Sequence, residues 1–197
     1  ILVSPRIQFQ HIKSIPMKKL FVTFLSATCS CLVSSCEKAT PEQTFARAVI
    51  NANLVSGFAG NGMKYQLENP SVKLMPSGQT APMTRKEVVD DQIRSIDESY
   101  QKVKNLGESD DNREILQASI ALYEYVLPVY RNEYSQLAGL YYRGAEKAEL
   151  EAAYKAIADN YLKGYQERAD SLLAAGKPFA ERHGIRVKWD VQTSPSP

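Results

Sequence analysis

Residues 111–142, DNREILQASIALYEYVLPVYRNEYSQLAGLYY, decide the fold. Their apolar and aromatic side chains recur every three or four positions, which is the period of an α-helix with one buried face. The members of this stripe are Leu116, Ile120, Tyr123, Leu127, Tyr130, Tyr134, Leu137 and Tyr141. Asp111 is a residue type that caps helices, so we expect one long helix that begins after it and ends at the turn of Arg143 and Gly144.

Pro128 lies inside this predicted helix. Its nitrogen has no hydrogen to donate, and its ring crowds the carbonyl group of Glu124, four residues earlier. We therefore expect a kink near residues 124–128.

Two more helices are predicted before this stretch. Thr40 and Thr84 each stand three residues before a Gln or Glu, which is the spacing of a capping box. Apolar residues at helical spacing follow both threonines. We expect the first helix to end at residues 60–62, Gly-Asn-Gly, and the second to end at Gly107.

The last helix is expected over residues 145–175, with a break or bend at residues 176–178, Gly-Lys-Pro, and an end at Gly184. Together the four segments predict an all-α fold. We interpret it as an irregular bundle of about four helices in a single domain over residues 40–191.

Residues 61–83 are the least regular part of this domain, with three prolines and Gly78. We expect a long loop here, with residues 63–67 as a short extended piece. Loops of this length are often functional or packed as Ω-loops, but a plain crossover between helices is the preferred interpretation. Residues 185–191 alternate apolar and charged side chains and predict a short extended tail, and residues 192–197 are expected to be disordered.

The cysteines and charges exclude several classes of function. All three cysteines, Cys29, Cys31 and Cys36, lie near the start of the chain. A cut before Cys36 removes four basic residues and no acidic one, so the formal net charge falls from +2 to −2 and a nucleic-acid partner is disfavoured. One histidine, His183, remains. We therefore expect no metal, no cofactor and no catalytic residues.

Residues 17–35 have the order of an export signal. Lys18 and Lys19 precede the uncharged stretch 20–33, LFVTFLSATCSCLV. This stretch is shorter than the about 20 apolar residues that cross a bilayer, but it has the length of a signal-peptide core. Small residues follow it and allow the chain to enter a peptidase site in extended form. We predict cleavage between Ser35 and Cys36.

Residues 33–36, Val-Ser-Ser-Cys, resemble the lipobox of bacterial lipoproteins, in which an aliphatic residue and two small residues precede an obligatory cysteine. Val33 stands where leucine is usual. Cys29 and Cys31 lie too early in the apolar run and lack the aliphatic residue in place. The resemblance implies a diacylglycerol thioether on Cys36, cleavage before it and acylation of the new amino group. An ordinary secretory signal or an N-terminal membrane anchor is the alternative.

The lipobox divides the chain. Residues 1–16 precede Met17 and follow neither helical nor strand periodicity, so we interpret them as an upstream artefact. Residues 17–35 are then the lipoprotein signal peptide, and residues 36–39 are a lipidated tether. We expect the chain to be lipid-anchored to a membrane of the bacterial cell envelope, with the outer membrane preferred, and to face the periplasm or the cell surface.

Tyrosine is the unusual residue of the predicted domain, since ten of the eleven tyrosines lie between Tyr100 and Tyr165. Most fall on the helical stripes and are expected in the core. Tyr125 and Tyr142 fall off the stripes, and they are the candidate ligand-binding residues because a flat apolar ring with a polar tip can stack on a sugar or bind an extended partner. His183 is interpreted as a partner of a helix C-terminus.

Two stretches, YRNEY at 130–134 and FAERHGI at 179–185, resemble the C-terminal part of small helical surface lipoproteins of unknown function. The resemblance spans residues 121–185, implies an envelope-exposed helical module and transfers no catalytic residue. The preferred hypothesis is a non-enzymatic helical binding or structural module with a membrane and an envelope protein as partners. The alternative is a lipoprotein that binds a small ligand, such as a glycan or an apolar molecule, through residues 61–83 and exposed tyrosines.

Overall fold

The computed structural model describes residues 38–187, and the predictions for residues 1–37 and 188–197 lie outside that range. The described chain is all-α, an irregular helical bundle, with one small two-stranded sheet. The elements are α1 (Pro41–Ala48), the 3₁₀ helix η1 (Ile50–Val55), α2 (Asn61–Glu68), β1 (Val72–Leu74), β2 (Thr80–Pro82), α3 (Arg85–Lys104), α4 (Arg113–Val129), the π-helical turn η2 (Tyr130–Tyr134), α5 (Ser135–Tyr142) and α6 (Lys147–Arg182).

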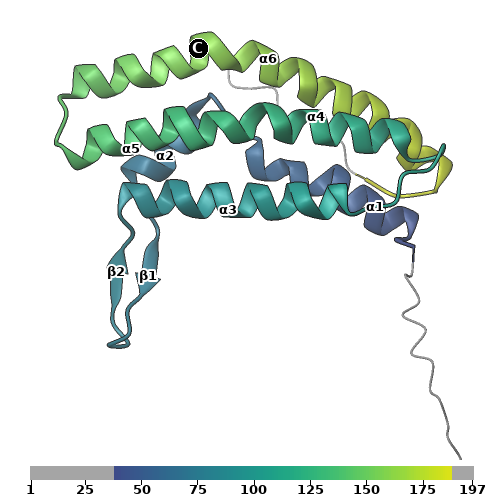
Figure 1. Ribbon diagram of the computed structural model, residues 1–197, viewed down its shortest axis with the longest axis horizontal. Helices are drawn as coiled ribbons and strands as arrows, with labels where there is room; N and C mark the ends of the chain where they lie inside the picture. Colours follow the sequence, from purple (N-terminus) through teal and green to yellow (C-terminus); the bar gives the residue numbers. More distant parts are fainter. Residues whose placement is uncertain (1–37, 188–197) are drawn as a thin grey trace, which may run out of the picture. The chain divides into compact units, whose positions relative to one another are not determined.

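Three long rods lie side by side in one layer (Figure 1). The middle rod consists of α4, η2 and α5, and it contacts α3 on one side and α6 on the other. The short helix α1 lies behind this layer and contacts α3, α4 and α6, while η1 contacts α3. The buried apolar side chains lie where these elements meet.

Both predicted capping boxes are confirmed. The Thr40 side chain accepts a hydrogen bond from the Gln43 backbone, and the Gln43 side chain accepts one from the Thr40 N–H at 3.1 Å. Thr84 and Glu87 make the same exchange at the start of α3. The first helix is shorter than predicted, because α1 ends at Ala48 and the chain continues as η1.

The long loop predicted over residues 61–83 is wrong. Residues 61–68 form α2, and residues 72–74 pair with residues 80–82 as an antiparallel hairpin. Met63 and Leu67 are both buried, and their four-residue spacing is helical. Five residues that alternate in polarity are too few to separate a strand from a helix, so burial against the bundle decided this segment.

The helix break predicted at residues 176–178 is also wrong. Helix α6 runs through Pro178 to Arg182, and Gly184, with a φ of 64°, follows its end as predicted. Phe179 and Ala180 are buried just beyond the proline. Their packing offsets the one backbone hydrogen bond that proline cannot make. Residues 185–187 form no regular element, and the rest of the predicted extended tail lies outside the described residues.

The helix also continues past Pro128, and its irregularity lies just after the residues where a kink was expected. The turn Tyr130–Tyr134 is π-helical, and α5 follows it directly. The Ser135 hydroxyl donates to the Tyr130 carbonyl at 3.2 Å, which satisfies one backbone group of the widened turn. Pro128 therefore lies within a continuous helical rod.

Asp111 does not cap this rod as predicted. The residue at the cap position is Asn112, whose side chain bridges the preceding loop: it accepts from the Ser109 N–H at 2.7 Å and donates to the Gly107 carbonyl at 2.9 Å. Asp111 instead lies 2.7 Å from His183 Nε2 and accepts from Arg182 at its carbonyl. The start of α4 is therefore tied to the end of α6.

One long-range hydrogen bond joins the N-terminal segment to the middle rod. The Ala59 N–H donates to the Tyr134 hydroxyl at 3.0 Å, and both residues are buried. Ala59 has a φ of 54°, a left-handed conformation that alanine adopts at a cost. Two residues earlier, a Cβ on Gly57 would lie 2.8 Å from the Gly62 Cα, so only glycine fits this close approach.

Tyr134→Phe is expected to lower the free energy of unfolding by about 1–3 kcal/mol, because the Ala59 N–H would be buried without its acceptor. The matched control is Tyr123→Phe. The Tyr123 hydroxyl is buried and makes no hydrogen bond within the described part of the chain. Its removal is expected to be neutral or to stabilise by up to about 1 kcal/mol. Urea denaturation at pH 7 measures both variants, and equal losses would contradict the assignment.

Candidate functional site

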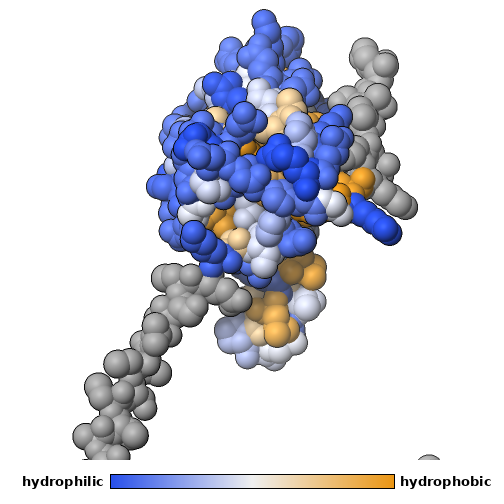
Figure 2. Space-filling view, turned by 90° about the vertical axis from the view of Figure 1, so that its right-hand side faces the viewer, coloured by the Kyte–Doolittle hydropathy of each residue, from blue (hydrophilic) through white to orange (hydrophobic). Residues whose placement is uncertain are grey.

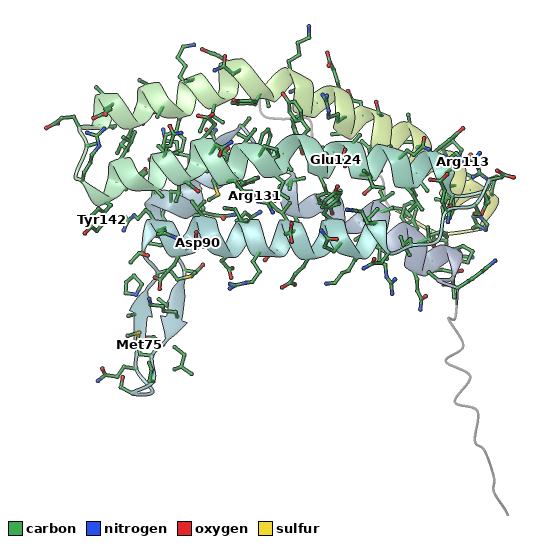
Figure 3. All side chains as sticks on the ribbon, in the orientation of Figure 1. Met75, Asp90, Arg113, Glu124, Arg131 and Tyr142 are labelled. Atoms are coloured by element: carbon green, nitrogen blue, oxygen red, sulfur yellow. The ribbon has the colours of Figure 1, made fainter. Side chains whose placement is uncertain are left out.

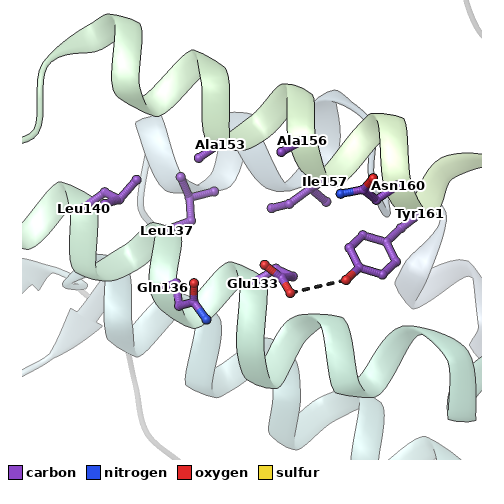
Figure 4. A pocket seen from close by; sticks show the side chains of 9 residues that line it. All are labelled: Glu133, Gln136, Leu137, Leu140, Ala153, Ala156, Ile157, Asn160 and Tyr161. Atoms are coloured by element: carbon purple, nitrogen blue, oxygen red, sulfur yellow. Dashed lines mark hydrogen bonds between the residues drawn. The ribbon is translucent and has the colours of Figure 1, made fainter.

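The described surface is hollowed between α5 and α6. These two helices form an antiparallel pair joined by residues 143–146, and the turn uses Gly144 at a φ of 69°. A groove of about 240 Å³ lies between them (Figure 4). It is lined by Glu133, Gln136, Leu137, Leu140, Ala153, Ala156, Ile157, Asn160 and Tyr161.

The groove exists because small side chains face larger ones. Ala153 and Ala156 stand three residues apart on α6 and lie opposite Leu137 and Leu140 of α5 (Figure 4). An alanine stops one carbon beyond the backbone, so it leaves space that the opposing leucines do not fill. Leu137 and Ile157 are buried and form an apolar floor.

One end of the groove is polar. The Tyr161 hydroxyl donates to Glu133 Oε1 at 3.3 Å, and this pair closes the groove toward η2. Burial, followed by the nearby Glu133 carboxylate, raises the pKa of Tyr161, so its hydroxyl keeps its proton at neutral pH. Gln136 and Asn160 are exposed on opposite helices. Their amides can both donate and accept hydrogen bonds. The groove therefore combines an apolar floor with a hydrogen-bonding rim.

The two tyrosines predicted to bind ligand lie apart. Tyr125 is half-buried between α4 and α6: its hydroxyl donates to the Tyr161 carbonyl at 3.2 Å, and the Arg168 guanidinium lies 4.1 Å from its ring centre. Tyr142 is 95% exposed at the end of α5 (Figure 3). They stand seventeen positions apart along one helical rod, about 25 Å at the helical rise. They cannot share one small ligand.

The small-ligand site predicted at residues 61–83 does not coincide with either pocket found in the described part of the chain. The second pocket lies between η1 and α3, and the tyrosines Tyr125 and Tyr142 line neither of the two. The predicted acylation and cleavage residues, Cys36 and Ser35, lie outside the described residues.

Sequence reasoning assigned Leu137 to the buried stripe but predicted none of the groove residues as a binding residue. The available signal was the pair Ala153 and Ala156, which places two small residues on the same side of α6 before the bulky Tyr161. His183 was predicted to be a partner of a helix C-terminus, and it stands at the C-terminal cap of α6. Its contact with Asp111 gives it a role in packing.

No protein-family model, no curated protein and no solved structure matches this chain. Among residues 38–187, no three or more His, Cys, Asp or Glu side chains gather where they could hold a metal ion. None of the helices in this same range combines the length and the apolar character that a membrane crossing requires.

The packing of Tyr125 can be tested through Gly164. A Cβ on Gly164 would lie 2.3 Å from the Tyr125 hydroxyl oxygen and 2.7 Å from its Cζ. Gly164→Ala is therefore expected to destabilise by about 1–3 kcal/mol through overpacking, even though alanine gains about 1 kcal/mol of helix propensity.

The matched control is Gly139→Ala in α5, where no atom lies within 4 Å of the added Cβ. This change is expected to stabilise by about 0.5–1 kcal/mol. Thermal and urea denaturation report both values. If Gly164→Ala stabilises as much as the control, Tyr125 is not held between the helices and returns as a free binding residue.

Proposed function

We propose that this protein is a lipoprotein of the bacterial cell envelope, anchored through an acylated Cys36, and that its helical domain is a non-enzymatic binding or structural module. The main support for the lipid anchor is the order of the segments in the signal. Lys18 and Lys19 come first, an uncharged core follows, and residues 33–36 then resemble a lipobox. The position of the fold supports it, because α1 is capped by Thr40, four residues after Cys36. A cut before Cys36 would leave the described domain intact behind a short tether.

Cys36→Ala is expected to abolish incorporation of an alkyne-palmitate label and to move the protein from the membrane fraction to the soluble fraction. Acyl chains supply most of the membrane affinity of such a protein, at about 0.8 kcal/mol per buried CH₂ group. Cys31→Ala is the matched control and is expected to change neither readout. Labelling that persists in Cys36→Ala would refute the lipobox assignment.

We place the partner contact of this module in the groove between α5 and α6. Its volume of about 240 Å³ is smaller than the about 300–1,000 Å³ of typical small-molecule sites. It has room for one or two apolar side chains, and the rim amides of Gln136 and Asn160 can bind the polar groups around them. This combination suits an apolar anchor on a helical segment of another envelope protein. The volume disfavours a glycan or another small ligand in this groove, whereas the open hollow between η1 and α3, of about 440 Å³, lies within that range.

The groove is tested by filling it. Ala156 is exposed, so Ala156→Trp places an indole in the groove without disturbing the core. A photo-crosslinking residue at Gln136 is expected to give a discrete protein-sized product in cells, and Ala156→Trp is expected to remove that product. The same crosslinker at Ser171, exposed on α6 outside the groove, is the matched control.

Native mass spectra of the protein, incubated with envelope extract, separate the two kinds of partner. An adduct of a few hundred daltons that Ala156→Trp removes would establish the small-ligand alternative. A crosslinked product that survives Ala156→Trp would place the partner contact elsewhere.

A further inference from the structure

The hairpin of β1 and β2 presents its apolar face outward. Val72 and Leu74 pair with Pro82 and Thr80, so these four side chains share one face of the sheet. All four are exposed, and Val72 and Leu74 reach 65% and 74% exposure. The other face carries Lys73 and is half-buried. This pattern reverses that of an ordinary antiparallel sheet, which turns apolar residues inward and polar residues outward.

The hairpin forms an arm that is paired with α3 through an ion pair. Two backbone hydrogen bonds extend its ladder, one of 2.8 Å from the Met83 N–H to Ser71 and one of 2.7 Å from the Met75 N–H to Gln79. Lys73 forms an ion pair with Glu87 of α3, and this contact, followed by those with the Thr84 cap, holds the pKa of Glu87 at about 2. Glu87 therefore stays ionised, and able to pair with Lys73, across the physiological pH range.

The arm is also nearly free of charge. From residue 69 to residue 84 the only charged side chain is Lys73, and it is already paired at the base of the arm. Met75, 37% exposed, adds a third large apolar side chain (Figure 3). In Figure 2 the hairpin lies beyond and below the bundle, and apolar residues gather on its surface. Such an arm fits an apolar surrounding better than water.

The start of the described chain lies on the same side of the bundle as this arm. In Figure 1 the beginning of α1 and the hairpin both lie below α3, at opposite ends of the layer. Cys36 is four residues before Thr40, so an extended tether reaches at most about 14 Å. An acyl anchor on Cys36 would hold this side of the domain next to the bilayer.

A second copy of the chain is a less suitable occupant. Helices α5 and α6, whose side chains line the groove, lie above α3 in Figure 1, whereas the hairpin lies below α3. A hairpin seated in the groove of another copy would make a head-to-tail contact, and such contacts form open filaments unless the rotation happens to close. The bilayer needs no such complementarity.

We propose that the hairpin is a second membrane contact, in which Val72, Leu74 and Met75 enter the headgroup boundary of the bilayer that holds Cys36. This inference rests on the proposed lipid anchor. The side chain of Lys73 would remain paired with Glu87 at the membrane surface. The outward residues of α3 would then face the lipid headgroups. Because α3 carries five basic and five acidic residues, the contact is expected to be hydrophobic and insensitive to salt.

The test uses the full chain, expressed in a bacterium that processes lipoproteins, with Leu74→Cys labelled by an environment-sensitive NBD fluorophore. Cleavage and acylation leave no other free thiol, and an intact mass confirms the acyl groups before labelling. The purified protein is reconstituted in phosphatidylethanolamine–phosphatidylglycerol vesicles. The matched control is Ser171→Cys on α6, away from the hairpin.

The label at position 74 is expected to shift to shorter wavelength on reconstitution and to be quenched by lipids that carry a spin label near the headgroup. The label at position 171 is expected to show neither effect, and 0.5 M NaCl is expected to leave the first result unchanged. An acylated protein whose position-74 label stays water-exposed would overturn this inference and leave the anchor standing. A shift without vesicles that grows with protein concentration would assign the arm to a second copy and overturn it too. A mass without acyl groups would overturn the anchor, and this inference with it.

Discussion

Phe58 joins the segment between η1 and α2 to the middle rod and α6. Its ring is buried and lies within 6.3 Å, centroid to centroid, of the rings of four tyrosines on α4, η2 and α6, namely Tyr125, Tyr130, Tyr134 and Tyr165. Each such pair contributes about 0.5–1.5 kcal/mol beyond its buried area. The chain turns tightly after Phe58, and Ala59 adopts a strained left-handed conformation. The packing of this cluster and the hydrogen bond to Tyr134 offset that strain.

The same cluster explains where most tyrosines of this chain are used. Their rings fill the spaces between rods, and their hydroxyls reach acceptors on neighbouring elements: Tyr100 donates to Glu124 at 2.7 Å, and Tyr141 and Tyr154 share a contact of 3.0 Å. Burial raises the pKa of Tyr134 to about 12, against an ordinary value near 10. Because this pKa is raised, the contribution of the protonated Tyr134 hydroxyl to stability is fully present below pH 10. That contribution is lost as the pH rises from 10 toward 12. At neutral pH these hydroxyls are fixed structural donors and acceptors.

What the sequence predicted well was local. The capping boxes at Thr40 and Thr84 depend on residues three positions apart, and the stripe of residues 111–142 depends on one helical period. What it missed depends on distant partners. Helix α6 passes through Pro178 because residues beyond the proline are buried, and the groove exists because alanines of α6 meet leucines of α5. Neither the depth of burial nor the pairing of two helices can be read from one helical period.

The hairpin was also missed because its recognition depends on the pairing of separate segments. Its strands are three residues long, and their apolar residues face outward, so no core-facing pattern marks them in the sequence. Only the paired register, with Val72 opposite Pro82 and Leu74 opposite Thr80, reveals that the exposed residues share one face. The uncharged run of residues 74–84, which looked like a plain crossover, then becomes the informative feature.

The positions of the hairpin and the groove agree with a protein that works at a surface. In Figure 1 the hairpin lies below α3, whereas α5 and α6, whose side chains line the groove, lie above it. An anchor near the start of α1, together with the hairpin, would give two points of attachment on one side of the domain. Two separated points limit the rotation that a single flexible tether allows. The α5–α6 side would then face away from the membrane, where another envelope protein can reach the groove.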